Sequence, residues 1–301
     1  MAIYHCSIKI ISRGKGKSAV AAAAYRSGEK LVNEYDGAIH DYTRKGGIVH
    51  TEILLPDNAP PAFSDRSALW NAVERIEKAK NAQLAREIEI ALPHELTREQ
   101  SISLVREYVK EQFVNAGMCA DVCLHDKNDG NPHAHILLTM RPIEQDGAWG
   151  AKQKKEYVLD KGGNKIYDPK KRQYKCKSVP ATDWNEQTKA EEWRAAWAEI
   201  CNSYLEKGNH TERIDHRSYE RQGIDLIPTV HLGVAAFQME KRGIRTERGN
   251  INREIEVTNQ KLRQLKARIF KLQSWLKEEA ANTEPPTLAE VIQGILSRRE
   301  Q

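Results

Sequence analysis

The sequence predicts an α+β protein in which a central, mostly antiparallel sheet carries helices packed on one face, followed by a C-terminal helical, coiled-coil-like appendage. Three observations support this fold class. Residues 1–143 alternate β-prone and helical runs in the order strand, helix, strand, helix, strand, helix, strand, strand. The last two strands are joined by a short polar turn. From Asn250 onward apolar residues recur at alternating four- and three-residue steps, which is the spacing of a heptad seam.

The N-terminal elements follow from local signals. Residues 3–11, IYHCSIKII, alternate as a strand does, and an alanine-rich helix follows, with Ser18 able to cap its start and Gly28 able to end it. Because alanine has little bulk, this helix can lie close to a sheet. The next predicted elements are a strand at 48–56, a helix at about 67–80 and a strand at 84–93 that ends at Pro93.

The middle of the chain continues with a strongly periodic helix at 97–117, capped by Thr97 and stopped by Gly117. Strands at 118–125 and 133–143 flank the turn DKNDGNP. Helix returns at about 183–207, and residues 214–233 are irregular, with proline and glycine near their end.

One long helix is predicted for the C-terminal part, and its heptad seam is expected to pack against a partner. The sequence leaves open whether that partner is a second copy, the chain's own domain or another protein. TEPP at 283–286 should stop this helix, and an amphipathic helix is expected at about 287–299. The expected organisation is therefore a functional domain at 1–248 with a basic insertion at 144–180, and a helical segment at 249–301.

Composition restricts the classes of protein. Of the 301 residues 30% are charged and 7% aromatic, and the mean hydropathy is −0.68. No apolar stretch reaches the roughly 18 residues of a membrane span, and the N-terminus lacks the apolar core of a secretory signal. Five cysteines without a tight CxxC pair fit reduced thiols in a cytosol better than a disulfide framework. We therefore expect a cytoplasmic protein with no membrane segment.

Positive charge is concentrated in the insertion. The net charge is +5, and residues 144–180 hold ten Lys and Arg against five Asp and Glu, an excess equal to that of the whole chain. The Gly-Gly turn in EYVLDKGGNKIYD predicts a hairpin within it. Interleaved aromatic residues suit single-stranded nucleic acid, whose bases can stack; they are Trp149, Tyr157, Tyr167 and Tyr174. A solvated lysine-rich loop explains the segment equally well.

Three histidines surround the turn between the last two strands. His133 and His135 share one face of their strand, and the turn returns the chain so that His125 lies beside its start. Three neutral imidazoles could therefore hold one metal ion and leave coordination positions open. A hairpin with incidental histidines is the alternative, but a third histidine across the turn and an apolar opposite face favour the metal.

Two further features could serve such a site. Glu87 and Glu89 share one face of their strand, where a carboxylate could accept the second N–H of a ligand histidine, although an exposed acidic pair fits the pattern better. Tyr25 ends the alanine-rich helix, and a tyrosine there could be core, stacking platform or nucleophile. As a nucleophile its phenol needs help, since its ordinary pKa is about 10.

These stretches together resemble the MobA/MobL group of plasmid relaxases, which are DNA-nicking enzymes of the HUH type. The resemblance covers residues 1 to about 250, in the family's order. It rests on MAIYH, SAVAAAAYRSG, REIEIALP, NPHAH, RIDHRSYERQGIDLIPTVHLG and GIRTER.

The resemblance implies a function. Tyr25 would attack one phosphodiester at a plasmid's origin of transfer, leaving a 5′-phosphotyrosine and a free 3′-OH for conjugative mobilisation. His125, His133 and His135 would hold the divalent ion, Mg²⁺ or Mn²⁺, and Glu87 would match the active-site carboxylate. It further implies a plasmid-encoded bacterial protein that meets single-stranded DNA at the origin, accessory mobilisation proteins and the conjugation coupling machinery.

Several cations are candidates for DNA contact, although surface or salt-bridge roles suit each of them as well. They are Arg13, Lys15, Lys17, Arg26, Arg141, Lys152 and Lys154. The insertion at 144–180 could also close over bound DNA as a flap.

Rival functions share parts of this pattern. A rolling-circle replication initiator or transposase of the same chemistry has the histidine pair but places its tyrosine after it, whereas Tyr25 precedes the histidines. A metal-stabilised DNA-binding accessory protein would need no nucleophile. A zinc hydrolase of small molecules is the most distant alternative.

Overall fold

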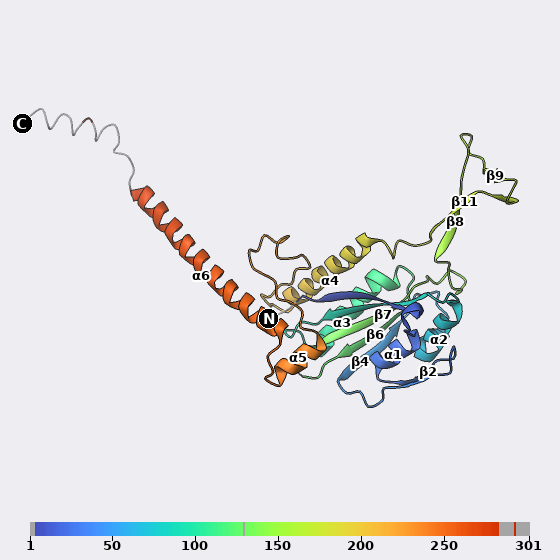
Figure 1. Cartoon of the computed structure of the whole chain (residues 1–301), viewed down its shortest axis with the longest axis horizontal. Coiled ribbons are helices and arrows are strands. Elements are labelled where there is room, and N and C mark those ends of the chain that lie inside the picture. Colours follow the sequence, from blue (N-terminus) through green and yellow to red (C-terminus); the bar gives the residue numbers. More distant parts are fainter. Residues whose placement is uncertain (1–3, 129, 283–291, 293–301) are drawn as a thin grey trace, which may run out of the picture. The chain divides into compact units, whose positions relative to one another are not determined.

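Alternating apolar residues build a five-stranded sheet at the centre of the N-terminal unit (Figure 1). In the computed structural model, which describes residues 4–128, 130–282 and 292, the strand order is β1-β5-β7-β6-β4 and every neighbouring pair is antiparallel. All five predicted strands are present: β1 (Cys6–Ser12), β4 (Ile48–Leu54), β5 (Gln83–Ala91), β6 (Ala120–His125) and β7 (His133–Thr139). The α+β class and the antiparallel sheet are therefore confirmed.

The larger core lies between one face of the sheet and helices α3 (Arg98–Val109) and α4 (Gln187–Lys207). Ile88, Ile136 and Leu138 come from the strands, and Tyr108 and Trp197 come from the helices; all five side chains are buried. The Tyr108 hydroxyl donates to the carbonyl oxygen of Trp193 at 2.9 Å, so its polar atom is satisfied in this core.

The opposite face is covered as well, which corrects the expectation of helices on one face only. Helices α1 (Ala19–Ser27) and α2 (Arg66–Ile76) pack there against Leu84, Ala85 and Leu137. The reason is visible in α1, whose alanines bring its backbone close to the sheet; Ala19, Ala23 and Ala24 are fully buried. This second face is the one on which His133 and His135 stand, because they alternate with Ala134 and Ile136 of the larger core.

The predicted helix boundaries are confirmed at their caps. Ser18 accepts from the Ala21 N–H at 3.2 Å, and Gly28 closes α1 with φ +71°. Thr97 forms a reciprocal capping box with Gln100. The helix expected at 97–117 is shorter, because α3 passes into a π-helical turn, η3 (Lys110–Val114), before Gly117.

Shorter elements complete the N-terminal unit. A small hairpin of β2 (Lys30–Val32) and β3 (Ile39–Asp41), which the sequence did not predict, follows α1. In the insertion β8 (Gln153–Tyr157) pairs with β11 (Cys176–Pro180), and β9 (Tyr167–Asp168) pairs with β10 (Gln173–Tyr174). The predicted Gly-Gly turn is present, since Leu159 bridges to Lys165. Two single 3₁₀ turns are η1 (Arg13–Lys15) and η2 (Pro61–Ser64).

A buried ion pair fastens α2 to the sheet. The Arg66 guanidinium makes two hydrogen bonds of 2.8 Å to the Asp121 carboxylate, and the Trp70 indole N–H donates to the same carboxylate at 2.9 Å. The side chains of Arg66 and Asp121 are 8% and 1% exposed. Glu29 also pairs with Arg66. The charges are thus almost fully compensated within the protein.

Breaking this pair should destabilise the fold strongly. We expect Asp121→Asn to lower the free energy of unfolding by about 3–5 kcal/mol, because it leaves the buried Arg66 charge without its main counter-ion. Urea unfolding measures the difference. Glu34→Gln is the matched control, since the Glu34–Arg75 pair is exposed and should be worth less than about 1 kcal/mol. Equal effects of the two substitutions would contradict the structural role of Arg66–Asp121.

The C-terminal unit spans Arg217–Gln301, after an N-terminal unit of Met1–His216. It contains α5 (Gly233–Lys241), which the sequence did not predict, and the expected long helix α6 (Glu247–Asn282). The predicted functional boundary at residue 248 stays a prediction. The two packing units divide earlier, between His216 and Arg217, because residues 225–232, which precede α5, contact α6. The helix expected at 287–299 and the stop at 283–286 fall outside the described residues.

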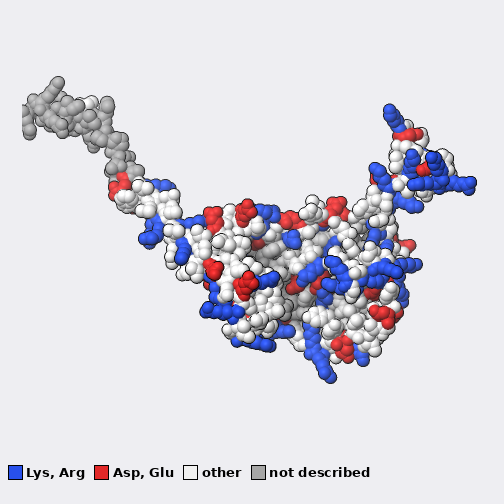
Figure 2. All heavy atoms as spheres, viewed as in Figure 1, with Lys and Arg blue, Asp and Glu red and all other residues white. Residues whose placement is uncertain are grey.

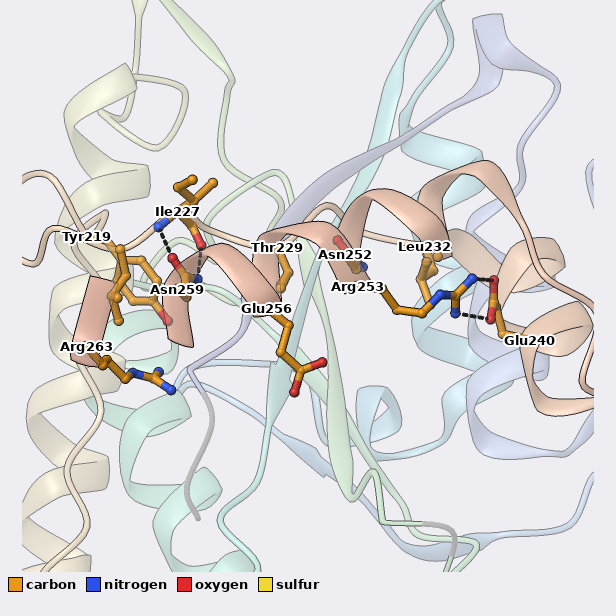
Figure 3. Close-up of a pocket in the computed structure, with 12 residues that line it drawn as sticks. Tyr219, Ile227, Thr229, Leu232, Glu240, Asn252, Arg253, Glu256, Asn259 and Arg263 are labelled. Atoms are coloured by element: carbon orange, nitrogen blue, oxygen red, sulfur yellow. Dashed lines mark hydrogen bonds and ion pairs between the residues drawn. The ribbon is translucent and has the colours of Figure 1, made fainter. Parts of the chain in front are cut away.

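An extended strap, residues 225–232, runs antiparallel along α6. The Asn259 side chain accepts from the Ile227 N–H at 2.9 Å and donates to its carbonyl at 2.8 Å (Figure 3). Asn252 makes the same pair of bonds with Val230, at 2.7 and 2.9 Å. Asn252 and Asn259 are both next to heptad-seam residues, so polar flanking positions of the seam carry this contact.

None of the helices in the described part of the chain is long and apolar enough to cross a membrane.

Candidate active site

Three histidine side chains converge on the second face of the sheet. Register places His125 of β6 directly opposite His133 of β7, and His135 lies two residues farther along the same face. Their ring centroids are 4.7–5.3 Å apart. One nitrogen from each ring lies within 4.8 Å of the others. The structure therefore brings together the three residues that the sequence singled out as metal ligands.

Each of these rings uses one nitrogen for a hydrogen bond inside the protein. His125 Nε2 donates to the carbonyl oxygen of Arg26 at 2.7 Å, and His133 Nδ1 donates to that of Asn131 at 2.8 Å. His135 Nδ1 donates to Glu87 Oε1 at 3.0 Å. Since carbonyl and carboxylate oxygens only accept, these bonds fix the tautomer of each neutral ring and leave its other nitrogen with a free lone pair.

Burial favours the neutral form of two of these imidazoles, those of His125 and His135. It lowers the pKa of His125 to about 4, against the opposing effect of the Arg26 carbonyl. Burial also lowers the pKa of His135, although the bond to Glu87 works in the other direction. A neutral imidazole is the form that binds a metal ion, so both groups are ready for coordination at neutral pH.

Glu87 is the ionised partner of this cluster. Burial alone would raise the pKa of its carboxyl, but the hydrogen bond from His135 and the guanidinium of Arg26 lower it to about 2. Arg26 reaches Glu87 Oε1 with Nε at 2.7 Å and with Nη2 at 2.5 Å. The neighbouring Glu89 instead accepts from Lys9 Nζ at 2.8 Å. Of the two carboxylates of the sequence pattern, Glu87 is the one that accepts a hydrogen bond from a histidine of the cluster.

Tyr25 lies on the last turn of α1, one residue before Arg26, whose carbonyl oxygen contacts His125. Its side chain is 47% exposed and contacts the edge of the Tyr42 ring, with centroids 5.2 Å apart. The core role considered for Tyr25 is thus excluded by its exposure. The next residue, Arg26, bonds His125 through its carbonyl and Glu87 through its side chain. One residue therefore ties the end of the tyrosine-bearing helix to two members of the cluster.

Several cations proposed for DNA contact already have partners within the chain. Arg13 bonds Glu74 at 2.7 Å, Arg141 bonds Glu77 at 2.7 Å, and Lys152 bonds Glu77 at 2.8 Å. Glu74 also accepts from the first N–H of α1 at 2.7 Å. These contacts favour structural roles for Arg13, Arg141 and Lys152, and Arg26 serves the histidine cluster. Exposed cations that remain from that prediction are Lys15, Lys17 and Lys154.

The insertion carries a dense set of exposed cations, and Figure 2 shows Lys and Arg gathered over it. Tyr157, Tyr167 and Tyr174 are 39–51% exposed and cluster edge to face. Trp149 differs from them, because it stacks on Phe63 and packs against the core of α1 and α2. Three of the four aromatic residues interleaved with the cations are thus accessible.

The roles of two residues at the site were not predicted from the sequence. Arg26 follows Tyr25 directly, but its role appears only when β5 brings Glu87 to it. Lys45, on the loop between β3 and β4, was not singled out at all, and its Nζ lies 3.7 Å from the centroid of the Tyr25 ring. No periodicity marks that loop, so no sequence signal could have found Lys45.

The fold and the site define an α+β protein whose histidine cluster is linked through Arg26 to the helix that carries an exposed tyrosine. The model of the MobA/MobL family matches residues 17–242. The chain belongs to the MobA/MobL family.

Individual relatives agree with this assignment. A "Probable mobilization protein MobA" of Bifidobacterium longum is 38% identical over 274 residues, covering 86% of this chain and 48% of the relative. A "Conjugal transfer protein TraA" of Agrobacterium fabrum is 41% identical over 262 residues, covering 82% of this chain and 23% of the relative. The chain therefore spans half or less of the length of these two proteins.

A solved structure has the same fold. The structure described as "Molecular Basis of Vancomycin Resistance Transfer in Staphylococcus aureus" is 35% identical to this chain, with a TM-score of 0.62. The similarity covers 72% of this chain and 100% of that one.

Proposed function

We propose that this chain is a relaxase that nicks one DNA strand at a plasmid's origin of transfer by transesterification, with Tyr25 as the nucleophile. The observation that carries the proposal is the connection through Arg26, which joins the tyrosine-bearing helix to His125 and Glu87. Family membership and relatives named for mobilization and conjugal transfer support it.

The histidine cluster fits a divalent metal ion. His125, His133 and His135 would supply three nitrogen donors, each oriented by the hydrogen bond of its other nitrogen. When bound, the ion would neutralise charge on the scissile phosphate and polarise its P–O bonds. Of the two ions expected, this donor set favours Mn²⁺, because Mg²⁺ prefers oxygen ligands more strongly.

The covalent step balances without a further reactant. The phenol oxygen of Tyr25 loses its proton and forms a bond to the phosphorus. The bond from phosphorus to the 3′-oxygen breaks, and the leaving 3′-oxygen takes up a proton. A phosphodiester replaces a phosphodiester, so the product stores the energy needed to reseal the strand. The exposed position of Tyr25 leaves its ring accessible to a DNA strand.

The exposed cations would hold that strand. Lys15, Lys17 and Lys154 are candidates for phosphate contacts, and the three exposed tyrosines of the insertion are candidates for base stacking. We further propose a cytoplasmic protein, whose five free cysteines would stay reduced, acting with accessory mobilisation proteins and the conjugation coupling machinery.

Overlapping labelled oligonucleotides from the origin region of the plasmid that encodes the chain would test this function. Both strands are incubated with the protein and Mn²⁺, and products are separated under denaturing conditions. We expect one oligonucleotide of one strand to yield a protein–DNA adduct and a shorter fragment with a free 3′-OH, and a chelator to prevent both. DNA binding without an adduct on any oligonucleotide would support the non-catalytic accessory protein instead.

Glu87 should matter for the metal although it is not a ligand in this proposal. We expect Glu87→Gln to weaken Mn²⁺ binding by about 10–100-fold, because the uncharged amide orients His135 less firmly and makes its ring less basic. Isothermal titration calorimetry measures the affinity. Glu77→Gln is a matched control, since Glu77 is also buried but pairs with Arg141 and Lys152. An unchanged affinity in Glu87→Gln would contradict this role.

A further inference from the structure

The loop between β3 and β4 is held against both the tyrosine-bearing helix and the histidine turn. At its start the Tyr42 N–H donates to the Glu29 carbonyl at 3.2 Å, just beyond α1. At its end the Asp126 N–H donates to the Gly47 carbonyl at 2.7 Å, one residue after His125. Gly47 has φ +85°, and a Cβ there would lie 2.4 Å from Lys127 Cγ. The close approach of the loop therefore depends on glycine at this position.

Lys45 of this loop contacts Tyr25 twice. Its Nζ donates to the Tyr25 carbonyl oxygen at 2.6 Å and lies 3.7 Å from the centroid of the Tyr25 ring. Tyr42, three residues earlier, meets the same ring edge to face. The loop thus supplies both the cation and the aromatic contact that define where the Tyr25 ring lies.

We propose that Lys45 is a positioning residue for Tyr25, which fixes the ring for attack and favours the charge that develops on its oxygen. The proposal rests on the nucleophilic role of Tyr25 proposed above. A phenol that loses its proton spreads negative charge into the ring, so a cation near the ring is attracted more strongly to the attacking form than to the resting one. After the bond to phosphorus forms, the ring is neutral again. Lys45 therefore affects the rate of the covalent step and not the affinity for DNA.

The protonation of Lys45 is compatible with this role. Burial, together with the charge of Arg26, lowers the pKa of the Lys45 ammonium to about 8. At neutral pH the group is still mostly charged. The contacts with Tyr25 carry the argument, and the attraction between Lys45 and the ring needs the charged form.

The test compares three substitutions of Lys45 in the full chain. Lys45→Met removes charge and donor, Lys45→Gln keeps a donor without the charge, and Lys45→Arg keeps both. The measurements are the single-turnover rate of adduct formation at saturating DNA, the dissociation constant for that DNA and the affinity for Mn²⁺. Arg44→Met is the matched control, because Arg44 is the exposed neighbouring cation of the same loop.

We expect Lys45→Met and Lys45→Gln to slow the single-turnover rate by about tenfold or more. Their DNA and Mn²⁺ affinities should stay within about twofold of the unmodified chain. Lys45→Arg should restore most of the rate, and Arg44→Met should leave it unchanged.

Three outcomes would overturn the inference: a normal rate in Lys45→Gln or Lys45→Met, an equal loss in Arg44→Met, or a loss confined to DNA affinity. A variant that fails to fold, judged by thermal unfolding, leaves the other two to decide. The failures of the two proposals are separable. If the unmodified chain forms the adduct and the Lys45 variants form it at the same rate, only the inference about Lys45 is refuted. If the unmodified chain forms no adduct, the relaxase function is refuted, and this inference with it.

Discussion

Replacing Tyr25 by phenylalanine is expected to abolish the covalent protein–DNA adduct. The substitution removes only the phenol oxygen, which is the atom that would bond to phosphorus, and keeps the ring between Tyr42 and Lys45. DNA and metal binding should be nearly unchanged. Denaturing electrophoresis of the labelled strand measures the adduct, and mass spectrometry of a protease digest locates the modified residue.

The matched control for this experiment is Tyr42→Phe, because Tyr42 contacts the Tyr25 ring and carries the same hydroxyl. It should still form the adduct. An adduct that persists in Tyr25→Phe, or one that maps to Tyr42, would show that the nucleophile has been assigned to the wrong residue.

His135→Ala should give the second large effect. It removes one of the three nitrogen donors and also the hydrogen bond that Glu87 accepts at 3.0 Å. We expect Mn²⁺ affinity to fall by more than about a hundredfold, because the loss of a ligand weakens metal binding more than the loss of a group that only orients a ligand. Adduct formation should fall with it. Calorimetry and the adduct assay measure the two quantities on the same preparation.

His94→Ala controls for loss of an imidazole near the same end of β5. His94 is exposed, and its Nε2 donates to the Gly130 carbonyl at 3.1 Å. This substitution should leave both quantities close to normal. If His135→Ala kept full metal affinity, the histidine cluster would not be the metal site.

The elements predicted well are those whose signals are local. Ser18 and Gly28 bound α1, and Thr97 begins α3, because each cap satisfies backbone groups within a few residues. Alternation along β7 placed His133 and His135 on one face, and the short turn placed His125 beside them. The convergence of the histidines therefore follows from strand alternation and turn length, both of which are local properties of the sequence.

The elements that could not be predicted depend on contacts between distant parts of the chain. Helices α1 and α2 cover the second face, but the sequence shows only that α1 is small enough to do so. Arg13 and Arg141 looked like free cations because their carboxylate partners lie 61 and 64 residues away. Lys45 lies on a loop without periodicity, 20 residues from the carbonyl that it contacts.

The contacts between the strap and α6 constrain the number of residues in the strap. Asn252 and Asn259 lie seven residues apart, about 10.5 Å along a helix, whereas Ile227 and Val230 lie three residues apart, about 10 Å in an extended chain. The two spacings match, so both asparagines meet a peptide group at once. One residue more or less between Ile227 and Val230 would put the second asparagine opposite the wrong atoms. In this stretch the number of residues is constrained as firmly as their kinds.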